Sequence, residues 1–293
     1  LSHVFAPEEQ LTKTMDSIAA NILERTNGAI EIQTYPQGQL ATYKDGVEQV
    51  VRGADFISVE DPSYLGDYVP DFNILAGPML VNSYDEYEYL LETPEVQDMF
   101  KRAEEKGIKI LSLDYIFGFR SLMTNKVITK PEDLKGMKLR VSNDPIMTGM
   151  VSGLGANATV VSFNELYSAL QTGVVDGAEQ PIANYQSNAF PEVAPNLILD
   201  GHTLGAIQVI ITDEAWDKLT PEQQDVLTEA GKYASEYNRK ISEEAENKVL
   251  DELKANGVSV VDVEDKTPWQ EACKDIIESS TKDNAELYQK ILD

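Results

Sequence analysis

The longest uninterrupted helical pattern in the sequence runs from Pro221 to Asn256, and its only glycine is Gly231. Its composition is dominated by Glu, Gln, Ala, Lys and Leu, which favour helix. At about 1.5 Å per residue such a helix would be roughly 50 Å long, which exceeds the width of a single small domain. We therefore expect it to cross two lobes. A break at Gly231 is the alternative, although an interior glycine costs a helix only about 1 kcal/mol.

Strand and helix patterns alternate along the rest of the chain, which is typical of an α/β fold. Strand patterns at "LSHVF" and "AIEIQTY" flank an amphipathic helix that begins after Pro7 and ends near Gly28. The stretch "IKILSLDYIFGFRSLMTN" is interrupted by Gly118, so it predicts either two strands or one bent strand. Since no flexible linker marks a boundary, we expect the chain to cross between the lobes more than once.

The charge of the chain limits its partners. The 293 residues include 50 Asp and Glu against 24 Lys and Arg, for a formal net charge of −26. Such a surface opposes binding to nucleic acid or anionic lipid. No apolar run approaches the roughly 20 residues that span a bilayer, and the opening "LSHVFAP" does not have the pattern of a signal peptide. We expect a mature form without membrane insertion, whose targeting segment or lipid anchor, if it had one, was removed.

Patterns typical of enzymes are missing from the sequence. It has no nucleophile elbow, phosphate-binding loop, dinucleotide-binding glycine pattern or C-x-x-C pair, and its two histidines, His3 and His202, are far apart. The acidic clusters do not have the alternation of a calcium loop. The single cysteine, Cys273, is expected to be a small core residue. We therefore expect no cofactor, no metal and no catalytic residue.

Two arginines stand out in strand patterns. Arg120 lies among apolar neighbours in "IFGFRSLM", and a buried guanidinium needs an anion, either a carboxylate of the protein or a ligand. Arg140 lies in "MKLRV", where the alternation puts Lys138 and Arg140 on the face opposite the apolar residues. By itself this pattern favours a solvent-exposed strand face for Arg140.

A long signature points to a family. "DLKGMKLRVSND", followed by "GANATVVSFNELYSALQTGVVDGAEQP", closely resembles the central signature of the extracytoplasmic solute-binding proteins of tripartite ATP-independent periplasmic (TRAP) transporters. The similarity extends from "IEIQTYPQGQL" and "ADFISVE" before this signature to "TDEAWDKLTPEQQDVL" after it. It therefore covers nearly the whole chain.

The resemblance implies an α/β fold of two lobes, a periplasmic-binding-protein-like clamshell with mixed sheets and a long helix that spans both lobes. We expect lobe I to comprise residues 1–117 and 207–247, lobe II to comprise residues 118–206 and 248–293, and the ligand cleft to lie between them. The implied partners are a small carboxylate ligand and the small and large membrane subunits of a sodium-driven transporter. The implied location is periplasmic or extracytoplasmic.

The resemblance also implies the ligand-binding residues. Arg140 matches the arginine that pairs with the ligand carboxylate, a geometry that fixes orientation as well as charge. Arg120 matches a supporting second arginine. Glu60 matches an acidic residue that accepts hydrogen bonds from ligand hydroxyls, Phe163 an aromatic packed beside the ligand, and Asn143 a polar contact.

Two further positions are less direct matches. Gln180 stands in "EQP" where the family often has Asn, so its longer amide either keeps the role with a shifted ligand or resizes the pocket. Tyr185 is included by position alone, one helical turn beyond Gln180. No role transfers to the segments around His3 or Tyr43, because the similarity slips there.

The implied ligand is a small organic acid bound with high affinity. Glu60 would repel a second ligand carboxylate but can bond to hydroxyls, so we expect a hexuronate-type sugar acid. Binding of a C4-dicarboxylate or sialic acid remains an alternative. So do a ligand-sensing domain with the same pocket and an enzyme acting on sugar acids.

Overall fold

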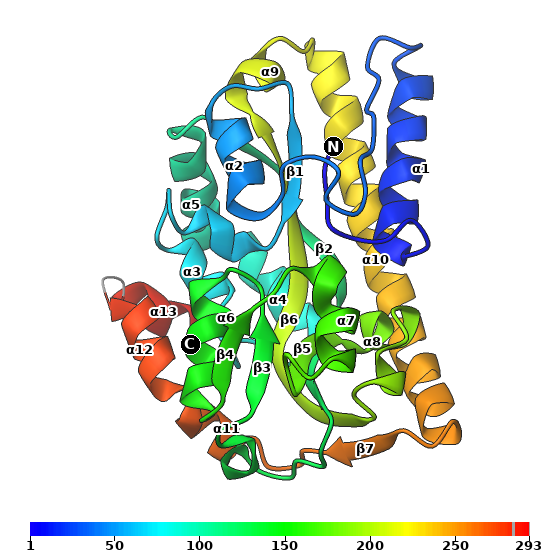
Figure 1. Ribbon diagram of the computed structural model, residues 1–293. Helices are drawn as coiled ribbons and strands as arrows, with labels where there is room; N and C mark the ends of the chain where they lie inside the picture. The colour runs from blue at the N-terminus through cyan, green and yellow to red at the C-terminus, as the bar shows by residue number, and fades with distance from the viewer. Residues whose placement is uncertain (283–284, 293) are drawn as a thin grey trace. The chain divides into compact units, whose positions relative to one another are not determined.

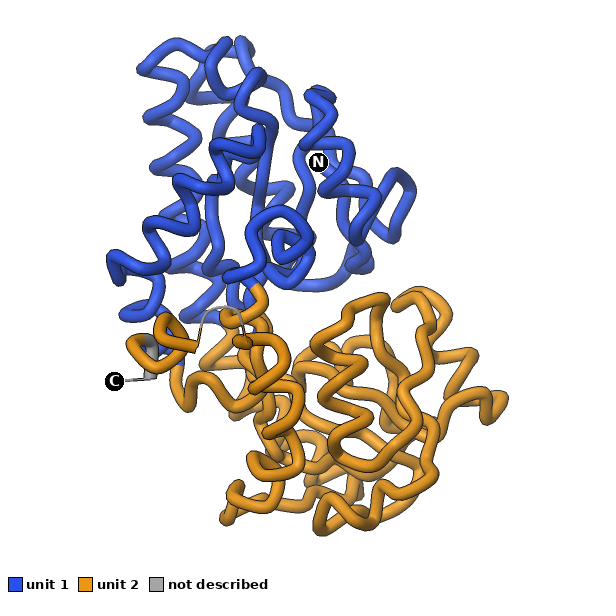
Figure 2. Tube along the Cα trace, turned by 90° about the vertical axis from the view of Figure 1, so that its left-hand side faces the viewer, with its two compact units in different colours: residues 1–72, 84–117, 206–241 blue, residues 73–83, 118–205, 242–293 orange. Residues whose placement is uncertain are grey.

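The computed structural model describes residues 1–282 and 285–292. The chain forms two compact units. Unit 1 comprises residues 1–72, 84–117 and 206–241, and unit 2 comprises residues 73–83, 118–205 and 242–293 (Figure 2). The chain therefore passes between the units more than once.

The strands form one mixed sheet of seven strands in the order β1-β6-β2-β5-β3-β4, with β7 paired to β6 (Figure 1). Pairs β1–β6 and β2–β5 are antiparallel, whereas β3 is parallel to both β4 and β5, and β7 is parallel to β6. The expectation of an α/β fold with a mixed sheet is confirmed. The strands are β1 Ile57–Glu60, β2 Ile108–Thr124, β3 Lys138–Val141, β4 Asn157–Val160, β5 Gly177–Pro181, β6 Asn196–Thr212 and β7 Ser259–Asp262.

Helices lie between these strands along the chain. The α-helices are α1 Gln10–Arg25, α2 Tyr43–Val51, α3 Phe72–Leu75, α4 Tyr84–Glu92, α5 Pro94–Glu104, α6 Pro145–Gly153, α7 Leu166–Gln171, α8 Ile182–Ser187, α9 Asp213–Asp217, α10 Pro221–Ala255, α11 Thr267–Ala272, α12 Lys274–Ser280 and α13 Ala285–Leu292. Short 3₁₀ turns are η1 Pro62–Leu65, η2 Pro131–Leu134, η3 Phe163–Glu165 and η4 Phe190–Glu192.

Helix α10 is continuous over 35 residues and passes through Gly231, so the alternative of two helices is wrong. Its residues up to Ile241 belong to unit 1 and those from Ser242 to unit 2. In unit 1 it is tied to α1, because Thr14 Oγ1 donates a hydrogen bond of 2.8 Å to Asn238 Oδ1.

Strand β2 settles the ambiguity at Gly118. It is one strand of 17 residues, in which Gly118 adopts a φ of 109°, a conformation that residues with a side chain rarely adopt. By contrast, the strands expected at "LSHVF" and "AIEIQTY" are wrong. There Ser2 forms only isolated bridges, to Tyr35 and to Ser58, which are too few to make a ladder.

In unit 2 both faces of the sheet are buried. Strand β3 places Leu139 and Val141 in a core shared with α6, α11 and α12, which includes Trp269 and the buried Cys273. The other face packs against a second core, formed largely by α7, α8 and the unit 2 part of α10. Parallel strands that are covered on both faces leave little room for exposed side chains.

Unit 1 has its own core. Apolar residues of α1, β1, β2 and β6 pack together with Ala234 of α10, and the N-terminal Phe5 joins them. Phe5 contacts Phe117 edge to face, at 5.8 Å between ring centroids. The N-terminal segment is therefore held by packing as well as by its isolated bridges.

We predict that Gly231→Ala raises the free energy of unfolding by about 0.5–1 kcal/mol, because alanine removes the helix penalty of glycine. Space allows the change, since an added Cβ would meet only the Leu111 carbonyl oxygen, at 3.4 Å. Denaturant unfolding measures the difference. The matched control is Gly153→Ala in α6, whose Cβ would lie 2.6 Å from the Ala272 carbonyl oxygen and should destabilise the protein. A destabilised Gly231→Ala variant would contradict the prediction.

Candidate functional site

Arg140 is buried, with 2% of its surface exposed. The alternation expected for β3 is correct, but the face that carries Arg140 is covered as well, so the alternative of a solvent-exposed strand face is wrong. Arg140 Nε donates a hydrogen bond of 2.8 Å to the Val161 carbonyl oxygen, just beyond β4. This bond fixes the direction of the guanidinium.

An aromatic ring lies beside this guanidinium. Arg140 Cζ is 5.9 Å from the centroid of the half-buried Phe163 ring, within the range of a cation–π interaction. Phe163 is itself held edge to face by Phe190, at 6.2 Å between centroids. The structure thus brings together two of the residues expected at the ligand.

Gln180 lies on the same face of the sheet as Arg140. Arg140 is the register partner of Ala178 on β5, and Gln180 is two residues further along that strand. Its side chain is buried, with 3% of its surface exposed. Arg140, Phe163 and Gln180 therefore form the core of the candidate site, which we call the Arg140 site.

Asn143 lies at the border of this region. It is exposed and lies two residues beyond the end of β3. The next residue, Asp144, caps α6 by accepting a hydrogen bond of 2.7 Å from the Ile146 N–H. The cap fixes the chain where it turns from β3 into the helix, so the position of Asn143 is well defined.

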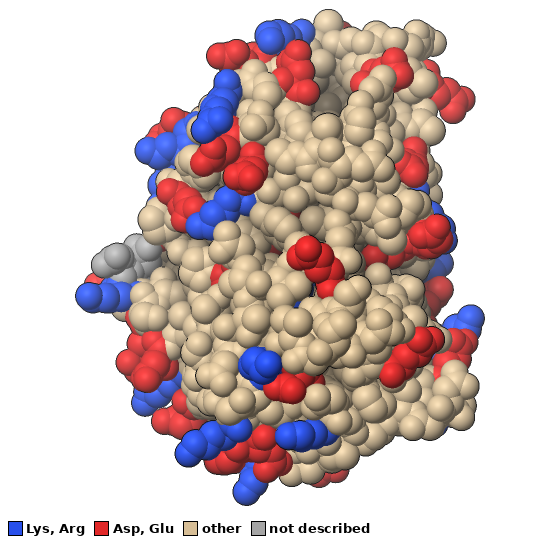
Figure 3. Space-filling view, in the orientation of Figure 1, with Lys and Arg blue, Asp and Glu red and all other residues tan. Residues whose placement is uncertain are grey.

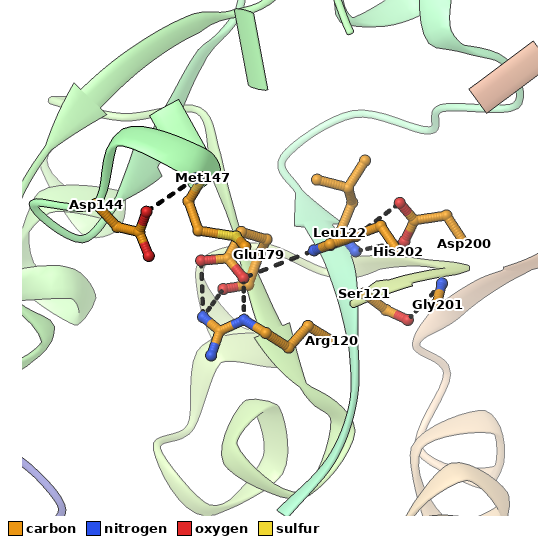
Figure 4. Close-up of polar contacts among 9 residues, drawn as sticks. All are labelled: Arg120, Ser121, Leu122, Asp144, Met147, Glu179, Asp200, Gly201 and His202. Carbon is orange, nitrogen blue, oxygen red and sulfur yellow. Dashed lines mark hydrogen bonds and ion pairs between the residues drawn. The ribbon is translucent and has the colours of Figure 1, made fainter. Parts of the chain in front are cut away.

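Arg120 is placed differently. Its guanidinium makes a two-pronged ion pair with Glu179 of β5: Nε contacts Oε2, and Nη2 donates a bond of 2.7 Å to Oε1 (Figure 4). Glu179 is fully buried, and the Arg120 side chain is 11% exposed. The alternative that Arg120 pairs with a carboxylate of the protein is therefore confirmed. By strand alternation, Glu179 faces away from Gln180 and hence from the Arg140 site.

Two residues of β6 extend this ion pair. Asp200 Oδ2 lies 2.8 Å from His202 Nδ1, and His202 Nε2 is 3.7 Å from Glu179 Oε2 (Figure 4). Burial alone would lower the pKa of His202, but the Asp200 and Glu179 carboxylates outweigh it and raise the pKa to about 9. Burial would raise the pKa of Glu179, but Arg120 and His202 hold it at about 2. We call these four charged residues the buried tetrad.

Tyr185 packs in the core of unit 2. Its side chain is fully buried, and its hydroxyl donates a hydrogen bond of 2.6 Å to the Ala194 carbonyl oxygen. The hydroxyl of Tyr185 is thus hydrogen-bonded to the backbone of unit 2. Tyr185 therefore supports the core of unit 2 and is not a member of the Arg140 site.

Glu60 belongs to unit 1, at the end of β1. It is 3% exposed, and its Oε1 accepts a hydrogen bond of 2.6 Å from the backbone N–H of Tyr43, the first residue of α2. Burial raises the pKa of Glu60 to about 8, against the lowering effect of the Tyr43 N–H. The raised pKa favours the protonated carboxyl near neutral pH, a form that can donate a hydrogen bond as well as accept one.

A comparison with protein families identifies the family of this chain. The profile of the bacterial extracellular solute-binding proteins, family 7 (DctP), matches residues 1–284. The chain belongs to this family. Within the residues that the structure describes, no helix is long and apolar enough to cross a membrane.

Solved structures of TRAP periplasmic solute-binding proteins are similar over the whole chain. The protein from Desulfovibrio salexigens, in complex with diglycerolphosphate, is 42% identical, with a TM-score of 0.96 over 99% of this chain and 94% of that one. A Fusobacterium nucleatum protein with bound sn-glycerol-3-phosphate is 36% identical, with a TM-score of 0.91 over 100% and 98%. A Roseobacter denitrificans protein with bound β-D-glucuronate is 30% identical, with a TM-score of 0.92 over 99% and 97%.

The partners of Arg120 are not evident from the sequence. Glu179 precedes Gln180 in "GAEQP" without a feature that marks it as a partner of Arg120, and His202 is far from His3 in sequence. The spacing of Asp200 and His202 was a usable signal, because residues two apart in a strand lie on the same face.

We predict that neither histidine titrates between pH 5.5 and 7.5. His3 is fully buried, and burial lowers its pKa to about 4, whereas His202 keeps its charge until about pH 9. NMR of the imidazole C–H groups resolves both, since the chain has only two histidines. Glu179→Gln should lower the pKa of His202 and leave His3 unchanged, because His3 belongs to unit 1.

The raised pKa of His202 makes the stability of the protein depend on pH. Because the pKa of His202 is about 9 in the folded protein, above its usual value of 6.5, His202 contributes its full stabilisation below pH 6.5 and loses it as the pH rises through 9. A His202 signal that titrates near pH 6.5 would show that the buried tetrad is not charged as described.

Proposed function

We propose that this protein binds a small, hydroxylated organic anion outside the cytoplasm and delivers it unchanged to the membrane subunits of a TRAP transporter. The observation that carries the proposal is the Arg140 site, a buried guanidinium with an aromatic ring at 5.9 Å and a buried amide on the same face. Membership of the solute-binding family supports the transport role. Binding and release require no chemical step, so we assign no catalytic residue.

The ligand that we favour is a hexuronate-type sugar acid. A related protein that is 30% identical binds β-D-glucuronate. In this chain Arg140 offers a positive charge for one carboxylate, and the protonated Glu60 offers a hydrogen-bonding group without a negative charge.

A second ligand class is a glycerol phosphate. The two related structures with 42% and 36% identity hold diglycerolphosphate and sn-glycerol-3-phosphate. These ligands share with a uronate one anionic group and several hydroxyls. An arginine pairs with phosphate as readily as with carboxylate, so Arg140 suits either class.

A thermal-shift panel at fixed salt separates the classes. We expect D-glucuronate or D-galacturonate to raise the melting temperature, because a ligand at 100 times its Kd stabilises the folded state by about 2.7 kcal/mol. Succinate should raise it less, because it has no hydroxyl group to bond to Glu60. A shift with sn-glycerol 3-phosphate alone would favour the second class, and a shift with succinate alone would contradict both. Mass analysis of the recovered ligand should show it unchanged.

We predict that Arg140→Lys weakens ligand binding by about 10- to 1000-fold, because a point charge cannot reproduce the planar fork of a guanidinium. Isothermal titration calorimetry with the best ligand of the panel measures the loss. The matched control is Arg25→Lys on the surface of unit 1, where Arg25 pairs with Glu229. Equal affinity of the Arg140→Lys variant and the unchanged protein would remove Arg140 from the site.

A further inference from the structure

A group of polar side chains lies on one face of the unit 1 sheet. Glu60 and Ser58 of β1 point to the same side, two residues apart, and Gln208 of β6 is the direct register partner of Glu60. Ser2 bridges to Ser58. Helix α2 packs closely over this side, because a Cβ on Gly46 would lie 2.8 Å from Ser58 Oγ and 3.5 Å from Glu60 Oε1.

Several of these side chains have buried polar atoms without hydrogen bonds. Within the described residues, neither the Oε1 nor the Nε2 of Gln208 has a partner, and the same holds for Ser58 Oγ and Ser2 Oγ. Gln208 and Ser2 are 0% exposed and Ser58 is 1% exposed. A buried polar group without a partner costs about 1–3 kcal/mol, so it calls for a functional or structural reason. An apolar side chain would serve better at position 208 if only packing mattered.

One oxygen of the Glu60 carboxyl group, which lies opposite Gln208, already accepts a hydrogen bond. Glu60 Oε1 accepts the Tyr43 N–H, which leaves one carboxyl oxygen for other contacts. Directly opposite residues of an antiparallel pair have Cβ atoms about 5 Å apart, so the Gln208 amide can reach this group. The amide has one donor group and one acceptor oxygen, so it can pair with the carboxyl in either protonation state.

We propose that Gln208 is a specificity-determining residue of the ligand site, and that the Glu60–Gln208 pair rather than Glu60 alone selects ligands with two neighbouring hydroxyl groups. The inference rests on the proposed function and names the ligand feature that unit 1 recognises. Glu60 and the Gln208 amide together present donors and acceptors from adjacent strands, a pattern that fits a vicinal diol. Each hydroxyl of a diol both donates and accepts, so it can satisfy atoms that are otherwise unpaired.

In this proposal Glu60 and Gln208 recognise the hydroxyl groups of the ligand, and Arg140 recognises its anionic group. Gln208 is neutral, so it cannot choose between anions by charge, and it distinguishes ligands only by the position of their hydroxyl groups. A site built to bond a hydroxyl rejects an analogue that lacks it, because its own buried polar groups are then left unpaired. The positive charge that attracts the anionic end of the ligand comes from Arg140.

Gln208→Met tests the inference, because methionine keeps the length of the side chain and removes both polar atoms. The probes are D-glucuronate and its monodeoxy analogues, with affinities measured by calorimetry. The unchanged protein should bind at least one monodeoxy analogue about tenfold or more weakly than D-glucuronate. In Gln208→Met, affinity for D-glucuronate should fall about tenfold or more, and the difference between D-glucuronate and that analogue should shrink.

The melting temperature without ligand separates this role from a structural one. Replacing an unpaired buried amide by an apolar group of similar shape should leave stability unchanged or raise it. A lower melting temperature, with D-glucuronate and every analogue weakened equally, would show that Gln208 only supports the fold. Gln208→Asn is a second variant, which keeps the amide but withdraws it by one methylene, and it should weaken discrimination at the same hydroxyl.

The matched control is Gln224→Met in the same unit, where the amide donates a hydrogen bond of 3.0 Å to the Trp216 carbonyl oxygen. Its affinities for all probes should equal those of the unchanged protein. If the unchanged protein binds D-glucuronate and Gln208→Met binds it equally well, this inference is wrong while the proposed function stands. If the unchanged protein does not bind D-glucuronate, the sugar-acid proposal fails and this inference fails with it.

Discussion

The buried charge of Arg120 is balanced by Glu179, and much of unit 2 depends on that pairing. The pair links β2 to β5, and His202 with Asp200 extends it to β6. Two positive and two negative groups thus compensate one another in a region of low dielectric. Removing one member would leave a buried charge without its partner, which typically costs about 3–5 kcal/mol.

This pairing separates the roles of the two arginines. The guanidinium of Arg120 is paired with a carboxylate of the protein. Arg140 lies beside the Phe163 ring and on the same face of the sheet as Gln180, and these neighbours support the proposal that it recognises the anion. The net charge of −26 does not oppose this role, because salt screens charges beyond about 10 Å while a buried guanidinium acts at contact. Figure 3 shows acidic and basic side chains interspersed over one face of the molecule, in keeping with selection by a few buried groups rather than by the surface.

Patterns within single elements were reliable guides to the fold. The composition of residues 221–256 predicted one helix, and α10 is continuous because an interior glycine costs less than packing along the helix recovers. The alternation in "MKLRV" correctly assigned the faces of β3. It could not show whether the face with Arg140 is covered, because the residues that cover it come from other elements.

The segment "LSHVF" has the pattern of a strand, but only isolated bridges hold it, because pairing with another strand also depends on residues elsewhere in the chain.

The sequence by itself determined the α/β class, the family, and the residues Arg140, Phe163, Gln180 and Glu60 as candidates, because each depends on a local motif. Only the tertiary structure decided which polar groups meet. Glu179 joins Arg120 across 59 positions of the chain, and Gln208 lies opposite Glu60 across nearly 150. Partner choice between distant strands depends on register, and register is set by the packing of the whole sheet rather than by the residues around each partner.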